Sequence, residues 1–472
     1  MSPGGSSGGS PIPEGSSSGG GKTSTGAEES SGSSTGATIE ETGSSSGSTT
    51  GELIETSTGA TDRSDALNIL FITADDLGWK ALDVHGALDH RPNLGQLAAV
   101  SRVFPRAFNV TSSCSSSRAS FATGLYPSQH GVTGLVHRFP ELSLAPDAFT
   151  VARALSEYGY VTGIAGKFHL SKLDDAEAFG YTEVGPRNIE DTEFVEDFLQ
   201  THVDDPFYLE LNFRQTHRRG SPRRWPIDPA FPVSPASVLV PEYWALPESE
   251  GLRVCLAGYL SQFCAMDALI GQVLDLLDRF GLRERTLVLF VSDNGISMPH
   301  NKTTLYDRGT GSPCLYSDPR DGFVGLDDSL VSSIDYATTI LEAAGVDVEG
   351  LPGALLSAVP QRDGIYSEMF SHASEIGMRA VRTDDWKFII NTSKEPIGTG
   401  EVNETWEQEL EYRPWMEPRQ EFELYEVSAD PQEQANIYRD KPEIAEELYA
   451  LLLAHAETTG DTTQLPPLDV SG

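Results

Sequence analysis

Four short runs of the chain carry side chains that bind metal ions or move protons. They are Asp75-Asp76, Lys167-Phe168-His169, His217-Arg218-Arg219 and Asp293-Asn294. The first and last runs offer only oxygen ligands, with no His or Cys beside them, and such a set suits a hard cation, Ca²⁺ or Mg²⁺. The alternative is that the Asp pair caps a helix and that the second pair opens a turn. Together the four runs predict a catalytic site with a bound metal ion.

A fifth run surrounds Cys114, in the sequence Thr111-Ser-Ser-Cys-Ser-Ser-Ser-Arg-Ala-Ser120. At the N-terminus of a helix, the backbone amides and the helix dipole favour an anion, and Arg118 would add a fixed positive charge nearby. This pattern predicts a nucleophile at Cys114. The alternative is a loop of small residues that enters a helix near Arg118, with Cys114 as a buried thiol.

Each of the four runs follows a segment that predicts a buried strand. The segments are residues 68–73, 160–165, 207–213 and 286–292, all short apolar runs without alternation, typical of a central sheet covered on both faces. Helical patterns lie among them, including residues 93–100, 149–158 and 253–280. Strands that alternate with helices indicate an α/β layered domain. In open α/β sheets ligands bind at the carboxyl ends of the strands, so we expect the four runs to meet there.

The two ends of the chain differ in character from this domain. Residues 1–64 are rich in Gly, Ser and Thr, and this composition predicts a disordered linker. The catalytic domain would span residues 65–350. Beyond it, residues 378–391 and 421–426 predict antiparallel strands with alternating faces, and residues 442–456 predict an amphipathic helix. We therefore expect a C-terminal α+β subdomain over residues 351–460 and a tail over 461–472.

The run around Cys114 resembles the signature of the sulfatase family, Cys-x-Pro-Ser-Arg followed by Thr-Gly and a further Gly. The resemblance extends from residue 68 to about residue 456 and is closest to the heparan N-sulfatase (sulfamidase) branch. It includes Asp75-Asp76, Lys167-x-His169, His217, Asp293-Asn294, Lys302 and the stretch from Glu423 to Pro431. Three positions differ from that branch. Ser116 stands in place of the proline, Arg214-Gln215-Thr216-His217 in place of His-Asp-Pro-His, and Lys302 in place of Arg.

The resemblance implies a fold, an activity and a role for each site residue. The fold would be alkaline phosphatase-like, with a mostly parallel central sheet sandwiched by helices. A maturation enzyme would oxidise Cys114 to formylglycine; one hydroxyl of its hydrate would attack sulfur, and the second would be deprotonated to expel sulfate. By the same resemblance, Ca²⁺ (or, less in keeping with the family, Mg²⁺) would bind to Asp75, Asp76, Asp293 and Asn294. Arg118, Lys167 and Lys302 would neutralise negative charge. His169 would act as the base and His217 as the acid.

Two further residues are candidates for substrate binding. His372, in Phe370-Ser-His-Ala-Ser374, would line the substrate pocket from the second domain, and the alternative is a structural histidine. Arg218, with Arg219 beside it, would meet anionic groups of the substrate or be plain surface charge.

The acidity of the chain restricts its partners. The formal net charge is −37, which argues against nucleic-acid binding, because phosphates require Lys and Arg. An anionic substrate is also repelled at long range, so the site must carry its own positive charge, with Arg214 as an additional candidate. This favours a focused anion pocket that acts on a terminal residue or a small oligosaccharide of a sulfated glycan such as a glycosaminoglycan.

The sequence leaves alternatives open for both the location and the function of the protein. No apolar run approaches the roughly 18 residues of a membrane span. The tail-like linker suggests a periplasmic, cell-surface or secreted protein tethered to a membrane or surface, and the alternative is a cytoplasmic protein with a disordered tail. A sulfuric ester or sulfamate hydrolase is the leading function. The alternatives are a phosphodiesterase or phosphonate hydrolase of the same superfamily and a non-catalytic binder of sulfated glycans.

Overall fold

The computed structural model describes residues 66–80, 92–172, 175–219, 224–240, 248–347, 349–396 and 417–470. The linker expected at residues 1–64 and the last two residues of the tail lie outside the described residues. The boundaries expected at residues 65, 350 and 460 remain predictions.

A mostly parallel sheet of eight strands forms the centre of the fold. Its order is β5 (Glu183–Val184), β4 (Val161–Gly166), β6 (Phe207–Phe213), β1 (Asn68–Ala74), β7 (Thr286–Ser292), β8 (Cys314–Ser317), β2 (Arg102–Val103) and β9 (Gly325–Leu326). The five strands from β5 to β7 are parallel, and β8 is antiparallel to both its neighbours. The four strands predicted from the sequence are the adjacent strands β4, β6, β1 and β7, so the α/β class is confirmed.

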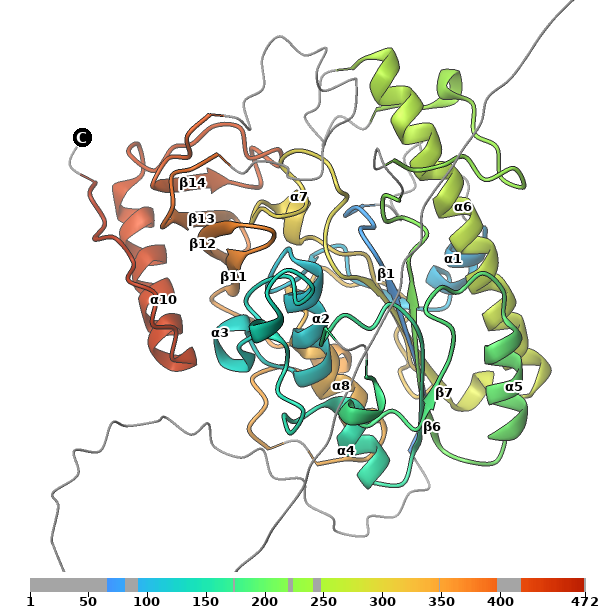
Figure 1. Cartoon of the computed structure of the whole chain (residues 1–472). Helices are drawn as coiled ribbons and strands as arrows, with labels where there is room; N and C mark the ends of the chain where they lie inside the picture. Colours follow the sequence, from blue (N-terminus) through green and yellow to red (C-terminus); the bar gives the residue numbers. More distant parts are fainter. Residues whose placement is uncertain are drawn as a thin grey trace, which may run out of the picture. The chain divides into compact units, whose positions relative to one another are not determined.

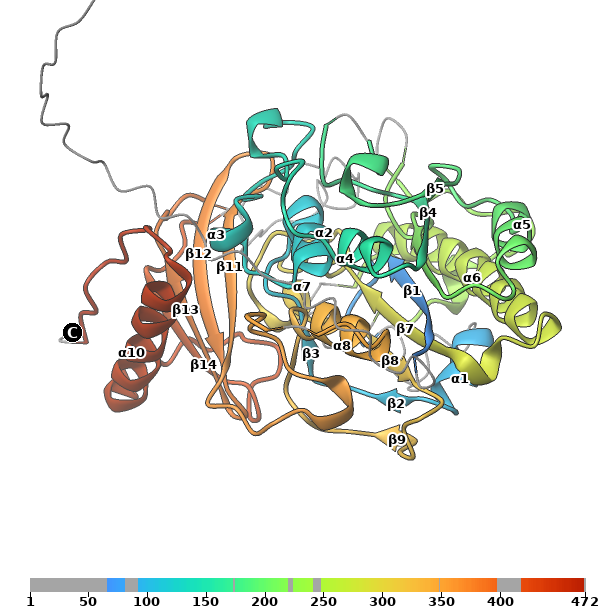
Figure 2. The same ribbon diagram turned by 90° about the horizontal axis from the view of Figure 1, so that it is seen from below.

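Helices cover both faces of this sheet (Figures 1 and 2). One face carries α1 (Pro92–Ala98), α5 (Glu193–Thr201) and α6 (Glu250–Arg279), and the other carries α2 (Cys114–Thr123), α4 (Val151–Glu157) and α8 (Asp335–Ala343). Along β1, Leu70 and Ile72 face the first group, whereas Ile69 and Phe71 face the second. The strand is therefore buried throughout, which explains its unbroken apolar sequence.

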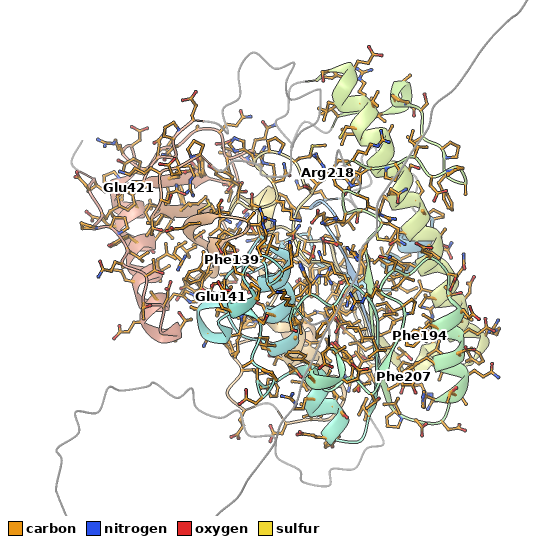
Figure 3. The ribbon with its side chains drawn as sticks, in the orientation of Figure 1. Phe139, Glu141, Phe194, Phe207, Arg218 and Glu421 are labelled. Atoms are coloured by element: carbon orange, nitrogen blue, oxygen red, sulfur yellow. The ribbon has the colours of Figure 1, made fainter. Side chains whose placement is uncertain are left out.

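Helix α6 departs from one expectation. It is the one helix in the described part of the chain that is long and apolar enough to cross a membrane, so the statement that no apolar run approaches this length was wrong. However, 83% of the apolar 18-residue stretch of this helix is buried inside the protein. In the same core, the ring of Phe198 on α5 lies 5.8 Å from the ring of Phe207 on β6 (Phe207 is labelled in Figure 3). Its apolar character is thus explained by the core of the domain.

A second, antiparallel sheet lies in the C-terminal part, beside α10 (Figure 1). It consists of β11 (Ile365–Ser371), β12 (Glu375–Arg382), β13 (Trp386–Asn391) and β14 (Phe422–Glu426), followed by α10 (Pro442–Thr459). The predicted antiparallel strands with alternating faces are confirmed. Side chains do alternate, but one face packs against Leu305 and Tyr306 and the other against Leu448 and Leu452 of α10, so both faces are buried.

The remaining elements are short. Strand β3 (Ala107–Phe108) pairs with β10 (Val331–Ser332), and helices α3 (Pro127–His130) and α7 (Asp307–Thr310) are single turns.

A buried ion-pair cluster joins α7 to the C-terminal sheet. Asp307 accepts hydrogen bonds from Lys387 Nζ at 3.1 Å and from Arg382 Nη2 at 3.3 Å. Removing the carboxylate would leave two cations buried without it, so we expect Asp307→Ala to lower the free energy of unfolding by about 3 kcal/mol in urea titrations. The matched control is Glu196→Ala, which breaks the half-exposed Arg279 pair and should cost less than about 1 kcal/mol. Equal losses would contradict this account of the cluster.

Candidate active site

The side chains whose oxygens could bind a metal ion lie side by side at the carboxyl ends of β1 and β7. Asp75 and Asp76 follow β1, Asp293 and Asn294 follow β7, and all four are fully buried. The two strands pair in parallel with Ala74 opposite Ser292, which sets the runs next to each other. The Asp76 amide donates to Asp293 Oδ1 at 3.0 Å. This register is why two runs more than 200 residues apart in sequence form one site.

Cys114 lies against this group of oxygens. It is the first residue of α2, and the Ser117 amide donates to the carbonyl of Ser113 at 2.8 Å, so the helix begins at Cys114 and not near Arg118 as one alternative assumed. Its Sγ lies 3.4 Å from Asn294 Oδ1 and 3.9 Å from both Asp75 Oδ1 and Asp76 Oδ1. Burial raises the pKa of the Cys114 thiol to about 12. The residue is therefore both a buried thiol and the start of a helix.

Three buried cations each pair with a different carboxylate. Lys167 Nζ donates to Asp75 Oδ1 at 2.7 Å, and Lys302 Nζ donates to Asp76 Oδ1 at 2.7 Å. Arg118 Nε donates to Asp293 Oδ2 at 3.0 Å. The charges of these six groups balance in pairs, which lets them stay buried.

Gly166 makes the Lys167 contact possible. It ends β4 with a φ of +93°, and a Cβ atom there would lie 2.0 Å from the carbonyl oxygen of Asn212 on β6. Only glycine permits both this φ and this close approach, and the chain then turns so that Lys167 reaches Asp75.

The carboxylates leave room for a cation of their own. The ligand atoms of Asp75, Asp76, Asp293 and Cys114 all lie within 4.8 Å of one another. Asp76 Oδ2 is buried and has no hydrogen-bond partner among the described residues, a costly state for a carboxylate oxygen. Burial, and next the charge of Asp75, raise the pKa of Asp293, which reflects the gathered like charge. These observations fit a hard divalent cation, which would satisfy the oxygen and offset the repulsion.

Two histidines follow the strands β6 and β4. His217 Nδ1 donates to the backbone carbonyl of Arg218 at 2.8 Å, and its Nε2 lies 4.0 Å from Asp76 Oδ2. His169 has a φ of +65°, an uncommon conformation outside glycine. Its Nε2 lies 3.0 Å from Nδ1 of His137, and its own Nδ1 is buried without a hydrogen-bond partner among the described residues. Burial lowers the pKa of both His169 and His217.

These groups open onto one cavity of about 320 Å³. Cys114, Lys167, His169, His217 and Lys302 line it, and so does His372, whose Nδ1 lies 3.0 Å from Ser113 Oγ. The structure therefore brings His372 to the cavity from the end of β11, as the sequence suggested.

The lining also includes three residues that sequence patterns gave little reason to select. His137 lies in a loop, Arg187 comes after the two-residue strand β5, which was not predicted, and Arg214 was only an additional candidate. Their common signal is positive charge or a titratable ring in an acidic chain, which becomes informative only when the loops are folded together.

Arg218 is placed elsewhere (Figure 3). Its side chain is almost fully buried outside this lining, with the guanidinium 4.5 Å from the centre of the Trp225 ring and Nη2 donating to Met298 Sδ at 3.4 Å. Arg219 donates to Gln262 on α6. After His217 the chain turns towards α6, so neither arginine joins the cavity in the structure. Only the backbone carbonyl of Arg218 contacts the site, by holding His217.

Known proteins place this arrangement in a family. Residues 67–346 match the family model described as Sulfatase. Human N-sulphoglucosamine sulphohydrolase is 31% identical over 448 residues, which cover 80% of this chain and 87% of that protein.

Solved structures agree on the fold. A 2-O glycosaminoglycan sulfatase superposes with a TM-score of 0.62 at 18% identity over 86% of this chain and 95% of its own. A phosphonate monoester hydrolase from Silicibacter pomeroyi superposes with a TM-score of 0.61 at 19% identity over 84% and 96%. The expected alkaline phosphatase-like fold is thereby confirmed. With the family model and the human relative, the conclusion follows that the chain belongs to the sulfatase family of hydrolases.

Proposed function

We propose that this sulfatase removes sulfate from sulfated sugars with a formylglycine nucleophile made from Cys114. The observation that carries the proposal is the charge of the cavity onto which Cys114 opens. Four Lys or Arg and four His side chains line it, whereas no Asp or Glu appears among its described lining residues. In a chain of net charge −37, such a lining selects for an anionic substrate. Conversion of the thiol to an aldehyde would supply, as its hydrate, an oxygen nucleophile at this position.

Asp75, Asp76, Asp293 and Asn294 would hold Ca²⁺. Their all-oxygen donor set and the unsatisfied Asp76 Oδ2 support this choice. When bound, the ion would polarise the S–O or S–N bond by binding a sulfate oxygen. The remaining steps belong to side chains of this chain.

Lys167 and Lys302 both line the cavity, the first paired with Asp75 and the second with Asp76. Both ammonium groups would neutralise the negative charge that builds up on the transferred sulfate. Arg118 contributes by fixing Asp293, and its Nη1 also donates to the Lys167 carbonyl at 3.1 Å. Three cations thus act from positions set by the carboxylates, so little reorganisation is needed during the reaction.

The two histidines would divide the proton transfers. The Nδ1 proton of His217 is held by the Arg218 carbonyl, which leaves Nε2 to carry the proton given to the leaving oxygen or nitrogen. His169 would take the proton from the second hydroxyl of the hydrate. Because its Nε2 is engaged with His137, its Nδ1 is the nitrogen left for this role.

The substrate would be a terminal sugar or a small oligosaccharide. A cavity of about 320 Å³ accommodates one sugar with its sulfate more readily than an extended polymer. The human relative is named for N-sulphoglucosamine, so glucosamine N-sulfate is the first compound to test. Gln215 stands where the heparan N-sulfatase branch has an Asp, and it is buried and donates to the Ile189 carbonyl at 2.6 Å. A sugar sulfate ester is therefore the second compound to test.

Maturation and location complete the proposal. A formylglycine-generating enzyme would act on Cys114, and residues 1–64 would tether the enzyme to a membrane or surface outside the cytoplasm. The sulfated polysaccharides that such an enzyme would degrade are found mainly outside cells, which supports this location.

Turnover of an aryl sulfate and of an aryl phosphate diester tests the chemistry. We expect sulfate release to exceed phosphate diester cleavage by at least about 100-fold in kcat/KM, because a diester places a second ester substituent where a sulfate ester presents a charged oxygen to Lys167 and Lys302. A calcium chelator should abolish sulfate release and lower the melting temperature by several degrees, since a ligand of the folded state stabilises it. Added Ca²⁺ should restore both. A protein that prefers the phosphate diester, or that keeps full activity and stability in chelator, would contradict the proposal.

A further inference from the structure

We propose that Arg214, with Arg187 beside it, forms a second anion subsite in the active-site cavity. The preferred substrate would then carry a second anionic group, a sulfate or a carboxylate, next to the sulfate that is removed. This inference rests on the proposed function, because it concerns the same cavity and substrate.

The inner cations cannot serve this purpose. Lys167, Lys302 and Arg118 each pair with a site carboxylate at 3.0 Å or less. With a divalent ion added they would balance the scissile sulfate and its nucleophile. Any further anion needs positive charge from elsewhere in the lining.

Arg214 supplies such charge. It lines the same cavity as Cys114 and is half-buried, so its guanidinium is partly removed from water. Its hydrogen bond runs from Nη1 to the neutral amide oxygen of Asn188 at 3.3 Å, and no carboxylate lies within 4.0 Å of it among the described residues. A cation of this kind on a cavity wall is available to an incoming anion. Bidentate contacts to sulfate or carboxylate are the strongest that a guanidinium makes.

The backbone fixes Arg214 beside the catalytic groups. It follows β6 directly, and its carbonyl accepts a hydrogen bond from the His217 amide at 3.1 Å. The preceding residue, Phe213, accepts from the Asp75 amide at 2.9 Å. Arg214 thus lies at the end of β6 with the proposed acid and next to the end of β1 with a proposed metal ligand, so the fold sets where its backbone lies relative to the scissile sulfate.

Arg187 belongs to the same wall. It follows β5, and the carbonyl of its neighbour Pro186 accepts from the Gly166 amide at 2.8 Å, which ties this loop to the end of β4. Asn188, the next residue, is the one that Arg214 contacts. The two guanidinium groups therefore come from loops that touch each other, and both line the cavity.

Arg219 lies close enough to Arg214 to feel its charge. Burial, and next the charge of Arg214, lower the pKa of Arg219, whereas the charge of Glu190 raises it.

Binding to the Cys114→Ala protein tests the subsite without turnover. Calorimetry would compare glucosamine N-sulfate, glucosamine 2-N,6-O-disulfate, and a disaccharide of N-sulfoglucosamine with a uronate. We expect at least one of the doubly charged ligands to bind about ten-fold more tightly than the single sulfate, and the comparison shows whether the second anion is a sulfate or a carboxylate. Arg214→Gln should remove that preference, because it should weaken binding of the doubly charged ligand about ten-fold more than binding of the single sulfate.

Arg219→Gln is the matched control, since it removes the same charge from a residue five positions further along the chain that does not line the cavity. This variant should keep the preference for the doubly charged ligand. Equal weakening of all ligands by Arg214→Gln, or an equal effect of Arg219→Gln, would overturn the subsite. Should Arg214→Gln fail to fold, the parent protein decides: no preference for either doubly charged ligand refutes the proposal. Binding of the single sulfate without such a preference leaves the proposed function intact, whereas no binding of any sulfated sugar refutes both.

Discussion

Replacing Cys114 with alanine is expected to abolish sulfate release and to leave the protein folded. The substitution removes the atom from which the nucleophile is made, and loss of a catalytic nucleophile lowers kcat by at least about 10⁴-fold. The Sγ atom makes only long contacts, of 3.4 to 3.9 Å, so little structural energy is lost with it. Sulfate release from an aryl sulfate and thermal unfolding of the same preparation measure the two effects.

Cys264→Ala provides the matched control. Cys264 is a free, partly exposed cysteine on α6, far along the chain from the strand ends, and its removal should change neither kcat nor KM beyond about two-fold. Activity retained in Cys114→Ala would refute the nucleophile. A parallel loss in both variants would point to damage by the substitution itself.

Replacing Asp76 with asparagine is expected to lower catalysis and to remove the response of the melting temperature to Ca²⁺. Asp76 Oδ1 accepts from Lys302 and Asn294, and an amide oxygen can still accept these bonds, whereas Oδ2 has no hydrogen-bond partner among the described residues. The lost carboxylate charge should weaken Ca²⁺ binding and lower kcat/KM by about 10³-fold, the size of a metal's contribution to charge stabilisation. The melting temperature without Ca²⁺ should fall by a few degrees, because the buried Lys302 ammonium loses its carboxylate partner. Added Ca²⁺ should no longer raise it.

Asp335→Asn is the control for the loss of a buried ion pair outside the cavity. Asp335 is equally buried but lies outside the cavity, where it accepts from Arg362 at 2.8 Å and from two backbone amides. Its substitution should cost about 2 to 3 kcal/mol of folding free energy and leave kcat/KM nearly unchanged at low temperature. If Asp76→Asn loses stability but keeps activity, the carboxylate is structural and the metal site is misassigned.

The sequence predicted the centre of the site because parallel strands share an edge. Asp75, Lys167, His217 and Asp293 each follow a strand that is buried on both faces, and such strands are visible as unbroken apolar runs. Once β4, β6, β1 and β7 are recognised, their carboxyl ends must lie together. The pairing of each cation with its own carboxylate did not follow from the sequence, since it depends on side-chain directions at the strand ends.

Residues outside the strand ends were harder to place. Arg218 stands next to His217 in sequence, yet the turn towards α6 buries it over Trp225. His137 lies in a loop, and Arg187 comes after β5, a strand of two residues, so no local pattern pointed to either; Arg214 follows β6 directly but was only an additional candidate. The short strands β2, β5 and β9 escaped prediction for a related reason, because two residues carry no periodicity.

The C-terminal sheet shows how tertiary packing overrides an apparent pattern. Residues 378–391 suggested alternating faces, and the chain indeed alternates, but α10 covers the face that would otherwise meet water. Lys387 lies on the other face, with Ile389, and there it pairs with Asp307 of α7. The burial of each face therefore follows from the element packed against it, α10 on one side and the α7 segment on the other.

Mass spectrometry of the peptide that contains Cys114 tests the central claim most directly. The protein is isolated from its own host and digested, and the mass of this peptide is compared with that of the unmodified sequence. We expect the lower mass of formylglycine, because conversion removes the sulfur atom, even though Ser116 replaces the proline of the family signature. A free thiol at Cys114 in every molecule of an active preparation would contradict the account.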